Sequence, residues 1–271
     1  PVGHAPREDD LTGPRDDGDA RPNPVRGAGG LMTARITVLA GHSGSGKTEI
    51  AVNRAIRLAR EGGRAALVDL DTVNHYFRTR IVYEQLKAEG VRVVLPPAGL
   101  QNVDIPIVSP EVFAVFHDPT WQVFVDLGGD AVGSRVLGQF AEGLEGKAEM
   151  LLVVNPFRPR TASAEKALTE AADILATAHL NWTGVLANPN LGPETTAADV
   201  LEGVEGAREC AWALGVPLVG VAVRRDLAAA VAEGLPGVAI EPLDIYLDRT
   251  VQVEHMGGRL HGSRSDQRRI V

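Results

Sequence analysis

The chain has few of the features that mark secreted, membrane-spanning or nucleic-acid-binding proteins. Its single cysteine, Cys210, cannot form an internal disulfide, and in the helix-like stretch EGARECAWAL we expect it to be a small buried apolar side chain. The net charge of −8 argues against a general nucleic-acid or anionic-membrane surface. No apolar run reaches the roughly 18 residues of a membrane span, and no signal-peptide pattern opens the chain. We therefore expect a cytoplasmic protein without a membrane span.

Aromatic side chains are also scarce, at 4% of the 271 residues, whereas 44% of the residues are hydrophobic. A core rich in alanine, valine and leucine suits close packing of helices on a sheet. A chain of this length forms one large domain or at most two small ones.

The two ends of the chain differ in composition from the middle. Residues 1–31 contain eleven prolines and glycines and almost no large apolar side chains, so we expect a disordered extension. Residues 255–271 carry four arginines against one aspartate and are expected to form a flexible basic tail. The remaining segment, 32–254, is predicted to be the folded domain.

Short β-branched runs alternate with longer helical patterns along this domain. Strands are predicted at 35–40, 64–70, 91–95, 121–127, 149–155, 182–188 and 217–223. Helices are predicted at 47–62, 109–118, 161–178, 194–214 and 225–234, and near 79–89 and 132–143. Because the strands are apolar on both faces, they indicate a parallel sheet covered on each side. The expected fold is one doubly wound, mostly parallel α/β domain with helices on both faces.

A glycine-rich loop follows the first predicted strand. Residues 41–48, GHSGSGKT, fit the pattern G-x-x-x-x-G-K-[ST] between a strand and a helix, the context that this motif requires. Its glycines let backbone N–H groups point inward around phosphate oxygens, and the helix N-terminus adds positive potential. Lys47 would reach the β- and γ-phosphates, and the Thr48 hydroxyl would bind Mg²⁺. The predicted nucleotide contacts here are Gly41, Gly44, Ser45, Gly46, Lys47, Thr48 and Glu49.

Three aspartates stand at the ends of two other predicted strands. Asp126 in VFVDLGGD is a candidate Mg²⁺ ligand, directly or through water, because parallel strands present their carboxyl ends at the ligand-binding edge. Asp69 and Asp71 in LVDLD end the second strand; Asp69 would support the metal and Asp71 would orient a water or a substrate hydroxyl. The alternative interpretation is that Asp126 only forms a turn or caps a helix, and that one of Asp69 and Asp71 is only a cap. The predicted metal site comprises Thr48, Asp69 and Asp126.

Together, GHSGSGKTE, ALVDLDTVNHYFRTR, VDLGGD and VLANPN resemble the MinD/ParA-like branch of P-loop NTPases, of SIMIBI type, which includes the cobyrinate-synthase-type nucleotide-binding domains. The resemblance covers about residues 35–250, and the chain is most similar to a group of bacterial ATP-binding proteins of undefined role. It implies ATP and Mg²⁺ as ligands and Lys47 and Asp71 as catalytic residues, with Asp71 positioning the attacking water. It also implies that Asn188 reads the adenine, with Pro189 beside it. No N-K-x-D guanine motif is present.

One position departs from that family. Its members usually carry a lysine directly after the first glycine of the loop, which reaches the partner's ATP across a homodimer, and this chain has His42 there. A histidine is shorter and mostly neutral near pH 7, so it does not replace a permanent cation. The end of the chain also lacks the bulky apolar residues of a membrane-binding amphipathic helix.

A second loop, NPFRPRT at 155–161, follows another strand end and is expected at the same edge as the phosphate loop. Asn155, Arg158 and Arg160 would contact phosphates, a substrate or a partner there, or be solvated. The seven histidines show no metal-ligand spacing.

Three functions remain open. The first is an ATPase whose nucleotide state changes an interaction with an unidentified protein partner, with a homodimer as one assembly. The second is an ATP-dependent ligase or kinase acting on a small-molecule acceptor, of cobyrinate- or dethiobiotin-synthase type or similar to adenylylsulfate kinases. The third is a module that binds ATP without turnover, although the acids at 69, 71 and 126 exceed what binding alone needs.

Overall fold

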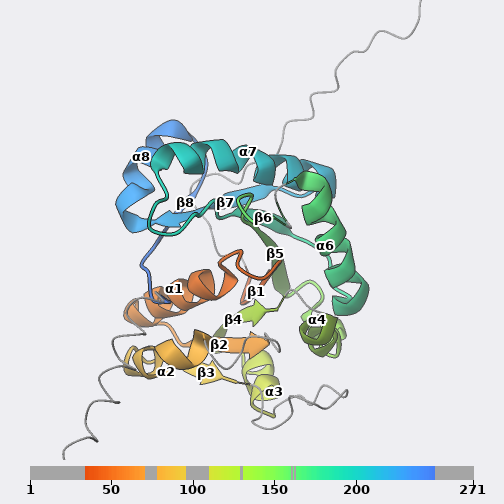
Figure 1. Ribbon diagram of the computed structural model, residues 1–271. Helices are drawn as coiled ribbons and strands as arrows, with labels where there is room; N and C mark the ends of the chain where they lie inside the picture. The colour runs from red at the N-terminus through yellow and green to blue at the C-terminus, as the bar shows by residue number, and fades with distance from the viewer. Residues whose placement is uncertain are drawn as a thin grey trace, which may run out of the picture.

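The computed structural model describes residues 34–70, 78–95, 110–128, 131–159, 161 and 163–247. Their strands form a single eight-stranded sheet in the order β3-β2-β4-β1-β5-β6-β7-β8, and every neighbouring pair is parallel. The strands are β1 (Ile36–Ala40), β2 (Ala65–Leu70), β3 (Arg92–Val94), β4 (Gln122–Leu127), β5 (Ala148–Val154), β6 (Gly184–Ala187), β7 (Leu218–Arg224) and β8 (Ile240–Leu243). The central strand, β1, lies between β4 and β5 (Figure 1).

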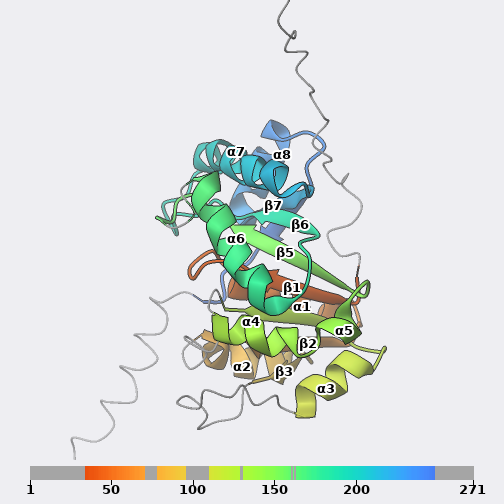
Figure 2. The same ribbon diagram turned by 90° about the vertical axis from the view of Figure 1, so that its right-hand side faces the viewer.

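Helices cover both faces of the sheet, and each face has its own apolar core. The face of α1 (Lys47–Arg60) and α2 (Arg78–Ala88) buries Leu39, Leu67 and Phe124 against α1. The other face carries the remaining helices (Figure 2). These are α3 (Pro110–His117), α4 (Ala131–Gly138), α5 (Ala141–Leu144), α6 (Ala164–Ala178), α7 (Ala197–Leu214) and α8 (Ala228–Gly234), which follows a 3-10 turn, η1 (Arg225–Leu227).

The predicted doubly wound α/β fold is confirmed, with four differences in detail. The sheet is entirely parallel, and it ends in an edge strand, β8, that the sequence pattern did not predict. The helix expected near 132–143 is two short helices, α4 and α5. Helix α6 begins at Ala164 instead of 161, because the Ser163 side chain accepts a hydrogen bond from the Lys166 N–H and caps the helix.

The proposed ends, 1–31 and 255–271, lie outside the described residues. The domain boundaries at 32 and 254 therefore stay predictions. None of the helices in the described part of the chain combines the length and apolar character that a membrane-crossing segment needs.

A buried ion pair joins α1 to the edge strand β8. Arg54 donates from Nε and Nη2 to the two carboxylate oxygens of Glu241, at 2.8 and 2.7 Å, and both side chains are fully buried. A planar guanidinium matches a carboxylate in this two-bond arrangement. Removing one partner would leave the other charged group buried without these two hydrogen bonds, which is costly.

We predict that Glu241→Ala lowers the free energy of unfolding by about 3–5 kcal/mol in urea denaturation, because it strands the Arg54 charge. The matched control is Glu89→Ala, which removes the partner of the exposed Arg60 and should have a much smaller effect. A double variant, Arg54→Met with Glu241→Leu, should recover most of the lost stability. Equal losses for Glu241→Ala and Glu89→Ala would contradict this account.

Cys210 lies fully buried on α7, as the sequence predicted, and burial raises the pKa of its thiol to about 11. Because the thiolate is the reactive form, the native thiol should react with a disulfide reagent at pH 8 far more slowly than the thiol of the urea-unfolded chain. The absorbance of the released thiolate follows both reactions. Equal rates in the two states would contradict the burial of Cys210.

Candidate site at the carboxyl edge of the sheet

The loop at residues 41–48 connects the end of β1 to the start of α1. Gly41, Gly44 and Gly46 have φ angles of +135°, +83° and +96°, which side-chain-bearing residues rarely adopt. The Ser45 N–H donates to the His42 carbonyl at 3.1 Å and closes the turn. The local sequence therefore folds into a tight loop whose last glycine, Gly46, is the N-cap of α1.

Lys47 and Thr48, the first residues of α1, are both 4% exposed. The Lys47 ammonium donates to the His42 carbonyl at 3.0 Å, so its charged end lies over the loop. The Thr48 hydroxyl donates to Asp126 Oδ2 at 2.6 Å. A cation, a hydroxyl and a carboxylate thus meet at the start of one helix.

Asp126 and Asp69 lie side by side near the carboxyl ends of β4 and β2. They are partners in the parallel register, each 2% exposed. Side chains alternate along a strand, and the residues two positions earlier, Phe124 and Leu67, pack on the α1 face. Both aspartates therefore belong to the α1 face, beside Thr48. Asp71 lies outside the described residues.

The end of β6 contacts the loop from the other side. The Asn188 side-chain amide donates to the Ser45 carbonyl at 2.6 Å, and the Asn188 N–H donates to the Val154 carbonyl at 2.8 Å. A β carbon on Gly46 would lie 2.0 Å from the Asn188 amide nitrogen. Pro189 is buried and packs against Gly203 of α7. Asn188 thus supports the loop backbone.

The loop after β5 lies beside the phosphate loop, as its position at a strand end predicted. Arg158 Nε donates to the Gly44 carbonyl at 3.2 Å. The Asn155 amide donates to the Asn190 carbonyl at 2.9 Å and links this loop to the end of β6. Arg160 lies outside the described residues.

His42 contacts a residue of its own chain that sequence reasoning missed. Its Nδ1 lies 3.2 Å from Oε1 of Glu170 on α6, and both side chains are partly buried. Glu170 stands within a helix, and no local pattern distinguishes it from the other acids there. The pairing arises only because α6 packs beside the loop.

Glu49 also has partners that the sequence did not reveal. Its carboxylate accepts hydrogen bonds from the backbone N–H groups of Tyr246 and Leu247, at 2.7 and 3.2 Å. One turn later, Asn53 donates to the Asp244 carbonyl and accepts from the Asp244 N–H, at 2.9 and 2.8 Å. Residues 244–247, which we call the C-terminal strap, are therefore fastened along α1.

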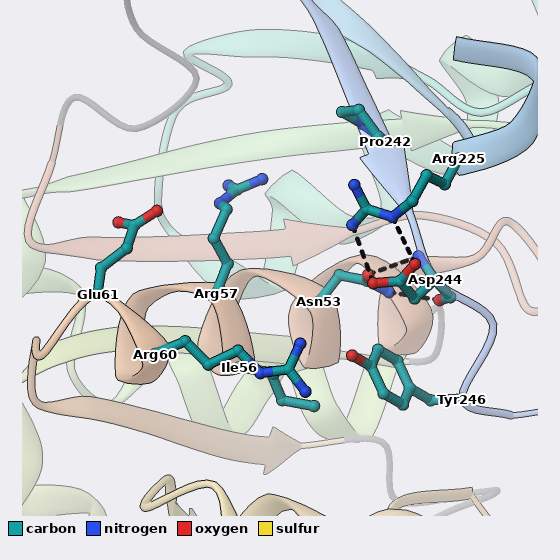
Figure 3. Close-up of a pocket in the computed structure, with 9 residues that line it drawn as sticks. All are labelled: Asn53, Ile56, Arg57, Arg60, Glu61, Arg225, Pro242, Asp244 and Tyr246. Carbon is teal, nitrogen blue, oxygen red and sulfur yellow. Dashed lines mark hydrogen bonds and ion pairs between the residues drawn. The ribbon is translucent and has the colours of Figure 1, made fainter.

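Asp244 and Tyr246 of the strap also line a pocket of about 190 Å³, whose lining side chains are drawn in Figure 3. Its lining comes from α1, β8, η1 and the strap, and includes none of residues 41–48. Its three arginines have acidic partners. Arg225 donates to Asp244 at 2.6 and 2.9 Å, which holds the pKa of that carboxyl below its ordinary value. We therefore interpret the pocket as part of the region where the strap is attached to α1.

Among the described residues, no group of three or more His, Cys, Asp or Glu side chains is arranged to hold a metal ion by itself. Phosphate loops do not need one, because Mg²⁺ there takes most of its ligands from phosphates and water. The Thr48 hydroxyl and the neighbouring carboxylate of Asp126 are the protein oxygens that suit such an ion.

A glycine loop between a parallel strand and a helix, with a buried lysine and an acid on the adjacent strand, defines a phosphate-binding α/β protein of the P-loop NTPase class. The sequence comparison identifies the family. The family model described as the CobQ/CobB/MinD/ParA nucleotide binding domain matches residues 36–237, which is most of the chain. The chain belongs to this family and carries a nucleotide-binding domain.

Solved structures give distant likenesses. A nucleotide-binding protein from Archaeoglobus fulgidus in complex with ADP is 16% identical, with a TM-score of 0.42 over 74% of this chain and 86% of that one. Cell division protein FtsY from Thermotoga maritima is 18% identical (TM-score 0.44, 74% and 65% covered). The signal recognition particle 54 kDa protein from Aeropyrum pernix, in complex with GDP, is also 18% identical (TM-score 0.43, 89% and 50% covered). The chain thus spans less than two thirds of the FtsY and 54 kDa chains. No curated protein matches its sequence.

We predict that Gly46→Ala lowers the free energy of unfolding by about 1–3 kcal/mol more than Gly62→Ala, as measured by urea denaturation. Gly62 also has a positive φ, +85°, but a β carbon there meets nothing within 4 Å. The difference between the variants therefore isolates the contact with Asn188. Adding Asn188→Ala to Gly46→Ala should recover part of the loss, and no recovery would contradict the proposed clash.

Proposed function

We propose that the protein is a Mg²⁺-dependent ATPase of MinD/ParA-like type whose nucleotide state controls an interaction with a partner. The observation that carries the proposal is the 2.6 Å hydrogen bond from the Thr48 hydroxyl to Asp126. It brings together the two protein groups that would hold Mg²⁺, directly and through water, beside the loop that would hold the phosphates.

The loop itself fits a polyphosphate. Its three positive-φ glycines keep side chains out of the loop backbone, and a β carbon on Gly41 would lie 2.7 Å from the Val153 carbonyl oxygen. The Ser45 hydroxyl is buried and has no hydrogen-bond partner among the described residues, so it has a donor to offer to a bound anion. Lys47, at the start of α1, adds a positive charge next to the helix N-terminus.

In the reaction, Lys47 and the loop N–H groups would stabilise the charge that develops on the transferred phosphoryl group. Mg²⁺, when bound, supplies further neutralisation of that charge. Asp71 would orient the attacking water, with Asp69 supporting the metal site; both roles come from the family resemblance. Asn188 and Pro189 would border the adenine. Glu49, one residue after Thr48, would lie next to the bound nucleotide.

The partner is a protein or a second copy of this chain. The lysine with which family members reach the partner's ATP is replaced here by His42, which is not a permanent cation. The His42 ring contacts Glu170 of its own chain. A homodimer would therefore need other groups to cross its interface. An acceptor small molecule, as in the ligases and kinases, is the alternative, and it would couple turnover to the presence of that acceptor.

The test is phosphate release from the purified chain with Mg²⁺ and ATP. We expect slow basal turnover that falls at least about tenfold in Lys47→Ala and in Asp71→Ala, because each removes a group that acts in the transition state. Asp71→Ala should still bind ATP, whereas Lys47→Ala should bind it more weakly. Lys147→Ala, which removes an exposed lysine far from the loop in sequence, is the matched control and should retain turnover.

Two outcomes would contradict the proposed function. Tight ATP binding without phosphate release in the unmodified chain would argue for the acceptor-dependent alternative or for a binding module, and candidate acceptors would then be screened. Turnover that survives Lys47→Ala would show that the activity does not belong to this loop.

A further inference from the structure

Arg158 is placed beside the phosphate loop by the sheet itself. Strands β1 and β5 are parallel neighbours with Ala40 opposite Leu152, so the loops that follow them leave the same edge of the sheet. The loop after β5 is the one that carries Arg158. Its guanidinium reaches Gly44, in the middle of the phosphate loop.

The backbone around Arg158 is held on both sides. The Arg158 N–H donates to the Asn155 carbonyl at 3.1 Å, and the Thr161 N–H donates to the Arg158 carbonyl at 2.9 Å. The Asn155 side-chain oxygen accepts from the N–H groups of Phe157 and Asn190, at 3.1 and 3.3 Å. The side chain therefore starts from a fixed point.

Only one N–H group of the Arg158 guanidinium has an acceptor among the described residues. The structure gives it one hydrogen bond among the described residues, from Nε to the Gly44 carbonyl, and no acidic side chain of that part of the chain lies within ion-pair distance. The arginines at the end of β7 and the start of η1 differ: Arg224 pairs with Asp226 and Arg225 with Asp244. Arg158 is exposed and keeps four N–H donors on its two terminal nitrogens.

We propose that Arg158 is a further substrate-binding residue, which donates from its terminal nitrogens to the outermost phosphate of a nucleoside triphosphate in the loop. The inference rests on the proposed function. The nearby Lys47 ammonium lies at the His42 carbonyl, two residues before Gly44, so both cations serve the same part of the loop. An arginine fork matches phosphate oxygens in pairs, and its effect grows with the charge on that phosphate.

The proposal has a measurable consequence. A contact to the outermost phosphate strengthens binding of a triphosphate and leaves binding of a diphosphate nearly unchanged. Calorimetric titration of the full chain with ADP and with a non-hydrolysable ATP analogue, both with Mg²⁺, separates the two cases.

For Arg158→Ala we expect about tenfold or greater weakening of the analogue and less than about twofold weakening of ADP, the size of a lost hydrogen bond to a charged group. Arg158→Lys, which keeps the charge without the fork, should lie between the alanine variant and the original chain. Arg208→Ala, which removes an arginine of α7 paired with Glu205, controls for net charge and should change neither affinity.

Equal weakening of both ligands in Arg158→Ala would overturn the proposal, because it would mean that the side chain only shapes the loop. Unchanged affinities in Arg158→Ala would overturn it as well. Failure of the proposed function is a different result: the original chain would then bind neither nucleotide. Thermal unfolding of each variant checks that the fold is retained, and the lysine variant keeps the test decisive if the alanine variant is unstable.

Discussion

Parallel pairing of β1 with both β4 and β5 is the constraint on which the rest of the structure depends. Because all strands point the same way, the loops after β1, β4, β5 and β6 leave one edge of the sheet. This arrangement brings Asp126 of β4 to one side of the phosphate loop and Asn188, directly after β6, to the other. Residues separated by more than a hundred positions in sequence, such as Ser45 and Asn188, become hydrogen-bond partners as a result.

The loop is consequently held from outside as well as by its own glycines. The Asn188 side chain lies where a β carbon on Gly46 would be. Arg158 donates to the Gly44 carbonyl, and Glu170 lies against His42. Three segments of the second half of the domain therefore contact a loop in the first half. Preorganisation of this kind reduces the entropy that binding of an anion would otherwise cost.

The sequence predicted what is local or periodic. The phosphate loop could be recognised because its chemistry lies within eight consecutive residues, and the α/β fold because its central strands are apolar on both faces. Strand β8 escaped prediction because Glu241 and Pro242 interrupt its apolar pattern; Pro242 is tolerated at the sheet edge, and Glu241 is buried only because Arg54 lies opposite, 187 positions away. The partners of His42 and Glu49 were hidden for the same reason, since they depend on how α6 and the strap pack.

The C-terminal strap connects the chain after β8 to the first turns of α1. Its backbone N–H groups hold the Glu49 carboxylate, one residue after Thr48, and its first residue is fastened to Asn53 on the next turn of α1. A shift of Tyr246 and Leu247 would therefore act, through these hydrogen bonds, on the helical turn that also carries Lys47 and Thr48.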